Sequence, residues 1–316
     1  MSFFVNMYTV FIQIVILAFI VLIGFFADRA KIFTEKTAKL SVDLLFYIIT
    51  PAVIINSFSK VEFTKENGLG FLFAFLCSSA FHVIAIVATL FLYKKGEREK
   101  NDVFRYATVY GNMGYMGLPL SFAVMQSFCG NGDIGTFYCS AAIVAFNIFA
   151  FTHGVWIMSG DSKEFNFKKL IFNPGTIGVA LGAPVFLLNL TLPEIIQTPL
   201  THIGNMNTPL AMLMFGTYLS KANFKTMFKQ GNIYVTAFFK LVLLPVVTIA
   251  IFYLLGIRGT MLVAASVFIS APTANNTVMF AAKFNKDTGL ASQVCAFVSI
   301  LSLVTMPACI AFAMSL

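Results

Sequence analysis

Two stretches of this chain place asparagine beside glycine or proline in otherwise apolar sequence. The first reads Gly-Asn-Met-Gly-Tyr-Met-Gly-Leu-Pro at 111–119, and the second reads Ser-Ala-Pro-Thr-Ala-Asn-Asn-Thr at 270–277. Glycine costs ~1 kcal/mol and proline ~3 kcal/mol in a helix interior, so a helix is predicted to break at both stretches. A broken helix presents free N–H groups and partial positive charge at a new N-terminus. With asparagine amides as further donors, this chemistry favours binding of an anion without a buried lysine.

We therefore expect one binding site to be built from both stretches. Its predicted members are Gly111, Asn112, Gly114, Tyr115, Gly117 and Pro119 from the first, and Ala271, Pro272, Thr273, Asn275 and Asn276 from the second. The alternative is that each proline only kinks a packed helix, as is common in membrane proteins. Two matched breaks rich in asparagine favour the binding site.

The composition places these stretches in a membrane protein. The chain has 316 residues, of which 59% are hydrophobic and only 11% are charged, whereas soluble domains carry about 25% charged residues. The net charge of +8 lies in short clusters between apolar runs, which is typical of orientation signals and not of nucleic-acid binding. The five cysteines have no metal-ligand spacing, so we expect neither a metal nor a cofactor.

The apolar runs predict ten membrane-spanning helices of about 20 residues each. They are 8–27, 38–58, 69–93, 103–128, 136–158, 170–190, 203–220, 233–255, 259–283 and 289–314. Asparagine and proline dilute the sixth and seventh runs, so eight or nine spans is the alternative.

The distribution of lysine and arginine favours ten spans. The loops that follow even-numbered runs hold only Lys60, Lys65 and Arg258, and Lys240 lies inside a run; the other 17 of the 21 cations follow odd-numbered runs. Because cytoplasmic loops carry the cations, we expect both termini outside the plasma (inner) membrane of a bacterium. The clusters at 163–169 and 221–229 share a side only if the sixth and seventh runs both cross or neither does.

Proline spacing predicts an internal repeat. Pro119 lies 68 residues after Pro51, and Pro272 lies 63 residues after Pro209. Two five-span halves have opposite orientations because five is odd, which is the inverted-repeat plan of many secondary transporters. The predicted fold is thus an all-α membrane protein of ten helices in two inverted repeats, with broken, crossing fourth and ninth helices. Chance alignment of four prolines among ten is the alternative.

The motif at 111–119, Asn173-Pro174 and Ser-Ala-Pro-Thr-Ala at 270–274 resemble the auxin efflux carrier family, which includes plant PIN carriers and bacterial malate or malonate permeases. The resemblance implies a fold similar to bile-acid symporters and sodium/proton antiporters. It also implies scaffold helices in 1–60 and 170–220, and mobile transport helices in 69–158 and 233–314, which move as an elevator. The chain lacks the long cytoplasmic loop of the longer plant carriers, since only residues 160–169 separate its halves. An organic acid other than auxin is therefore favoured as the substrate.

Three ionisable side chains inside the runs are candidates for coupling or counter-charge. Asp43 could instead reach interfacial water, His82 could be a neutral hydrogen-bonded imidazole, and Lys240 could extend toward the cytoplasm. The leading hypothesis is a secondary transporter of small organic anions, coupled to a proton or sodium and forming a homodimer through the scaffold. A ligand-sensing receptor and an anion channel are the alternatives. Without paired acids, an enzyme is not expected.

Overall fold

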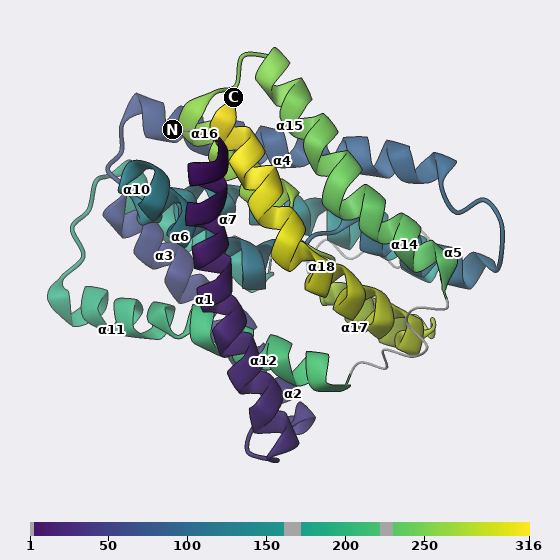
Figure 1. Cartoon of the computed structure of the whole chain (residues 1–316). Coiled ribbons are helices and arrows are strands. Elements are labelled where there is room, and N and C mark those ends of the chain that lie inside the picture. The colour runs from purple at the N-terminus through teal and green to yellow at the C-terminus, as the bar shows by residue number, and fades with distance from the viewer. Residues whose placement is uncertain (1–2, 161–171, 222–229) are drawn as a thin grey trace.

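The computed structural model describes residues 3–160, 172–221 and 230–316, and every regular element in these ranges is helical (Figure 1). The predicted cytoplasmic cations Lys163, Lys168, Lys169, Lys225 and Lys229 lie outside the described residues. In Figure 1 the two ends of the chain lie at the same end of the molecule, where α1 and α18 begin and finish respectively.

The helices of the first half, with π-helical turns labelled η, occur in this order. They are α1 (Phe3–Arg29), α2 (Glu35–Leu44), η1 (Leu45–Ile49), α3 (Thr50–Lys60), α4 (Lys65–Phe91), α5 (Arg98–Val109), η2 (Met113–Gly117), α6 (Leu118–Cys129), α7 (Gly132–Phe149), η3 (Ala150–Gly154) and α8 (Val155–Ser159).

The second half follows with α10 (Pro174–Leu187), α11 (Glu194–Asn205), α12 (Asn207–Lys221), α14 (Gly231–Phe238), η5 (Phe239–Leu243), α15 (Leu244–Leu254), α16 (Gly259–Ile269), α17 (Asn276–Lys283) and α18 (Thr288–Ser315).

Five continuous helical stretches in the described residues are long and apolar enough to cross a membrane. They are Lys36–Lys60, Lys65–Phe91, Gly132–Ser159, Gly231–Leu254 and Thr288–Ser315. Two shorter apolar helices are Pro174–Leu187 and Gly259–Ile269. These stretches confirm an integral membrane protein made of helices. The full count of ten crossings and the inverted repeat remain predictions.

Proline explains where three of the π-helical turns occur. Pro51, Pro119 and Pro245 are each the second residue of the α-helix that follows η1, η2 or η5. A proline in a helix has no N–H to donate, and its ring clashes with the carbonyl four residues earlier. Widening the preceding turn to the i→i+5 pattern moves that carbonyl away. The chain therefore remains helical through these prolines.

Polar contacts between helix ends occur in two separate groups. In one group, Ser220 donates to the Asp28 carboxylate, joining the ends of α12 and α1, and the Lys286 ammonium lies 3.1 Å from the Asp102 carboxylate. In the other group, the Lys60 ammonium lies 3.8 Å from the Asp133 carboxylate. Asp28, Asp102 and Lys286 follow odd-numbered runs, and Ser220 is the last residue of one. Lys60 and Asp133 follow even-numbered runs. The contacts thus pair ends predicted to share a side of the membrane.

Candidate functional site

Two interrupted helices meet at their interruptions. The first interruption separates α5 from η2, and the second separates α16 from α17. Gly111 and Thr273 form an antiparallel β-bridge, in which the Asn112 N–H donates to the Pro272 carbonyl at 2.6 Å and the Ala274 N–H donates to the Tyr110 carbonyl at 2.9 Å. Each irregular segment thus satisfies backbone groups of the other, as buried irregular backbone requires.

The first interruption is shorter than the predicted 111–119. Only 110–112 are non-helical, because the helix resumes as η2 at Met113 and continues through Pro119 in α6. Asn112 makes this early start favourable: its side-chain oxygen accepts from the Tyr115 N–H at 3.2 Å, and its carbonyl accepts from the Gly117 N–H at 3.1 Å. Such capping satisfies donors that the start of a helix would otherwise leave open.

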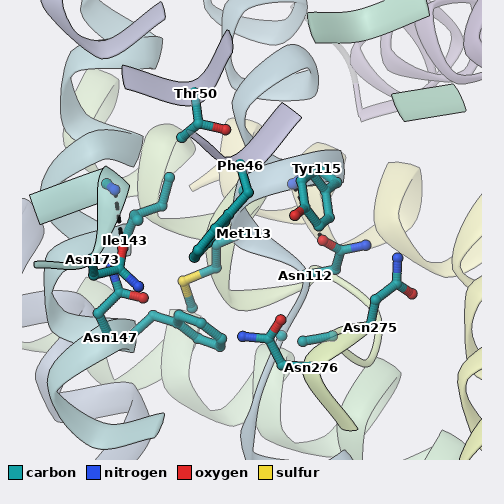
Figure 2. A pocket seen from close by; sticks show the side chains of 15 residues that line it. Phe46, Thr50, Asn112, Met113, Tyr115, Ile143, Asn147, Asn173, Asn275 and Asn276 are labelled. Atoms are coloured by element: carbon teal, nitrogen blue, oxygen red, sulfur yellow. Dashed lines mark hydrogen bonds between the residues drawn. The ribbon is translucent and has the colours of Figure 1, made fainter. Parts of the chain in front are cut away.

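A cavity of about 50 Å³ lies beside the paired segments. Its lining residues are Phe46, Thr50, Gly111, Asn112, Met113, Gly114, Tyr115, Ile143, Phe146, Asn147, Asn173, Gly175, Ala274, Asn275 and Asn276. Figure 2 shows Asn147 and Asn173 on one side, Asn112 and Asn275 on the other, and the Phe46 ring between them. Among the described residues that line the cavity, none carries a charge.

Six of the eleven predicted site residues line this cavity: Gly111, Asn112, Gly114, Tyr115, Asn275 and Asn276. The other five, Gly117, Pro119, Ala271, Pro272 and Thr273, are absent from its lining. Thr273 illustrates their structural use, since its buried hydroxyl donates to the Ala107 carbonyl of α5 at 2.8 Å. The Pro272 carbonyl accepts from Asn112 in the paired segments, whereas Gly117 and Pro119 lie within the helix formed by η2 and α6.

The cavity also contains polar residues that the sequence reasoning did not assign to a site. The Asn173 side-chain oxygen accepts from the Asn147 side-chain amide at 2.9 Å and from the Gly175 N–H at 2.9 Å. Asn147 lies in apolar α7, where a buried amide is a signal that could have been used. Asn173 was noted only as part of the Asn173-Pro174 motif, and Thr50 was not assigned to the site. Their position at a site depends on long-range packing.

Three helix N-termini converge on the cavity. Asn112 is the N-cap of η2, which continues into α6; Asn173 is the N-cap of α10; and Asn275 is the N-cap of α17. All three N-caps line the cavity. Each helix N-terminus carries partial positive charge, and the Asn112 and Asn173 side-chain oxygens already accept from the N–H groups of Tyr115 and Gly175. The site is thus electropositive without a cationic side chain in its lining, an arrangement that suits an anion.

The three ionisable candidates lie in different surroundings. Asp43 is exposed on α2 and is absent from the cavity lining. His82 is fully buried on α4, also outside the lining. Lys240 is fully buried in η5, and its ammonium donates to the Val109 carbonyl at 3.3 Å, at the end of α5. A methyl group added to Gly111 would lie 3.0 Å from this ammonium, so the Lys240 side chain lies close to the paired segments.

Interrupted helices that pair beside a polar cavity are typical of the substrate sites of membrane transporters. The comparison with known families agrees, because the model described as "Membrane transport protein" matches residues 9–167 and 161–310. The chain belongs to this family, and its resemblance to the auxin efflux carriers is confirmed. It is also similar to "Uncharacterized transporter MJ1031" of Methanocaldococcus jannaschii, with 24% identity over 285 residues that cover 88% of this chain and 90% of that protein.

Proposed function

We propose that the protein is a secondary transporter of small organic anions that binds its substrate in the cavity beside the paired segments. The observation that carries the proposal is the convergence of three helix N-termini, each with asparagine at its N-cap position, on a cavity whose described lining is uncharged. A carboxylate would accept hydrogen bonds from helix N–H groups and from asparagine amides. Phe46, Met113 and Phe146 provide an apolar wall for the rest of the substrate.

The position of the cavity supports an elevator mechanism. Phe46, Thr50 and Asn173 come from the helices assigned to the scaffold, whereas Asn112, Asn147 and Asn275 come from those assigned to transport. If the transport helices slide along the scaffold, a substrate bound mainly to the paired segments would move with them. The hydrogen bond between Asn147 and Asn173 crosses this boundary, so it would break and re-form during each cycle.

Counterflow in proteoliposomes tests the transport proposal. We expect vesicles preloaded with unlabelled acid to accelerate entry of the same labelled acid, because a carrier returns faster when loaded. Malate, malonate and indole-3-acetate form a suitable first panel, with protein-free vesicles as the control for diffusion. Uptake that is never accelerated by preloading would indicate a channel, and specific binding without uptake would indicate a receptor.

Cysteine labelling from outside intact cells tests the orientation. Cys129 is exposed, whereas the other four cysteines are buried. Cys129 follows the fourth run, so we expect a membrane-impermeant maleimide to label it from outside. In a Cys129→Ser, Gly96→Cys variant, we expect labelling only after permeabilisation, because Gly96 lies in a cationic loop. If that variant is labelled in intact cells and the wild-type protein is not, the orientation in the membrane is the opposite of the one predicted.

A further inference from the structure

Four side chains near the paired segments form a cluster of ionisable groups that does not line the anion site. They are Lys240 of η5, His82 of α4, Tyr110 between α5 and η2, and His153 of η3. Lys240, His82 and Tyr110 are fully buried, whereas His153 is partly exposed near the end of the fifth helical run. Buried ionisable groups are costly in a membrane and generally mark ion or proton pathways.

His82 has one ring nitrogen available to receive a proton. Its Nδ1 lies 2.7 Å from the Ser78 carbonyl; because a carbonyl only accepts, Nδ1 must carry hydrogen. In a neutral imidazole the other nitrogen, Nε2, is then an acceptor. Nε2 is buried and has no hydrogen-bond partner in the described part of the chain. It is therefore an unused base inside the protein.

Tyr110 connects the partly exposed end of the cluster to the buried end. Its hydroxyl donates to the Phe149 carbonyl at 2.9 Å and also lies 2.9 Å from His153 Nδ1. The rings of Tyr110 and His82 pack against each other, with centroids 5.8 Å apart. The Tyr110 carbonyl also accepts from Ala274 in the paired segments. The same residue thus belongs to the cluster and to the segments that line the anion site.

Lys240 places the cluster's charge close to the anion cavity. Its ammonium lies 5.0 Å from the centre of the Phe81 ring and beside Gly111, which lines the cavity. His82 interacts electrostatically with both Lys240 and His153. The three bases of the cluster are His82, His153 and Lys240. The Tyr110 hydroxyl belongs to it too, and the Tyr106 ring packs against the Tyr110 ring. None of these facing groups is a carboxylate. Simultaneous protonation of neighbouring bases is disfavoured, so their proton occupancies are coupled.

We propose that this cluster binds a proton that is co-transported with the anion, an inference that rests on the proposed transport function. A proton enters at His153; as it bonds to the Tyr110 oxygen, the Tyr110 O–H bond breaks and that proton moves on, so the hydroxyl is regenerated. The proton then forms an N–H bond with the lone pair of His82 Nε2, or of Lys240 when that side chain is a neutral amine, and this bond breaks when the proton leaves to water on the other side. A positive charge at Lys240 stabilises an anion in the cavity, and by linkage the anion stabilises the bound proton to the same extent.

Gradient-driven uptake tests this coupling. Proteoliposomes are loaded with a pH-sensitive dye, and their membrane potential is clamped at zero with valinomycin and equal potassium. The probe is malate or malonate, whichever shows counterflow. We expect about tenfold accumulation of the acid per pH unit for each proton carried, since one unit corresponds to a tenfold ratio of proton activity. The internal dye should report acidification that depends on the acid.

Three variants assign the coupling to the cluster. Tyr110→Phe removes the hydroxyl but keeps the ring, and His82→Gln and Lys240→Gln remove the two buried bases. We expect all three to lose gradient-driven accumulation, with Tyr110→Phe still showing counterflow. His202→Gln is the matched control, because His202 is exposed on α11 outside the cluster. Folding is checked by elution as a single species from a sizing column.

The outcomes separate this inference from the proposed function. Counterflow without accumulation or acidification in the wild type would overturn proton coupling and leave the carrier intact. Full accumulation in all three variants would overturn the assignment to this cluster. Absence of counterflow with every acid of the panel would instead contradict the proposed function.

Discussion

Asn112→Asp and Asn173→Asp are expected to abolish anion transport while the protein still folds. In both residues the side-chain oxygen accepts the capping hydrogen bond, from Tyr115 in one case and from Gly175 in the other. Aspartate caps helices as well as asparagine does, so the local structure should be retained. A carboxylate in the cavity would repel a bound anion by ~4 kcal/mol at 4 Å separation with an effective dielectric constant of 20. Transport at low substrate concentration should then fall by about three orders of magnitude.

Asn131→Asp provides the matched control for these variants. Asn131 is the N-cap of α7, and its side-chain oxygen accepts from the Ile134 N–H at 3.1 Å. It is exposed and does not line the cavity. We expect Asn131→Asp to fold and transport normally in the same counterflow assay. Wild-type counterflow in both Asn112→Asp and Asn173→Asp would mean that the anion binds elsewhere.

The sequence predicted the breaks because glycine and proline have large, local effects on helix stability. It did not predict their extent. Pro119 was expected at the first break, yet the widened turn of η2 and the Asn112 cap keep Pro119 within helix. Pro272 does lie in the irregular segment, where its carbonyl accepts from Asn112. Whether a proline breaks a helix therefore depends on hydrogen bonds supplied by distant residues.

Two of the five asparagines that line the cavity could not be predicted in the same way. Asn112 and Asn275 lie beside the breaks and are recognisable from local sequence. Asn147 and Asn173 are 26 residues apart and meet only because α7 and α10 pack together. A polar residue in an apolar run indicates function in a membrane helix, but it does not identify its partner. The packing of α10 against α7 supplies that information.

Two of the three glycines of the first motif, Gly111 and Gly114, are expected to respond oppositely to alanine. A methyl group on Gly111 would lie 3.2 Å from the Ala271 carbonyl oxygen as well as close to Lys240, so the paired segments would have to separate. Overpacking of this kind costs about 1–3 kcal/mol. A methyl group on Gly114 would meet nothing within 4 Å. Since Gly114 is helical, alanine there should stabilise the protein by up to ~1 kcal/mol.

Transport measurements complete the comparison of Gly111→Ala and Gly114→Ala. Gly114 lines the cavity, so its added methyl group should occupy substrate space and weaken affinity even though the fold gains stability. Gly111→Ala should lower both the melting temperature and the transport rate, because it moves the segments that hold the site. Thermal unfolding and counterflow on the same purified samples measure both quantities. A stable Gly111→Ala variant with wild-type transport would show that close pairing of the segments at Gly111 is not required, and an unaltered affinity in Gly114→Ala would remove Gly114 from the substrate site.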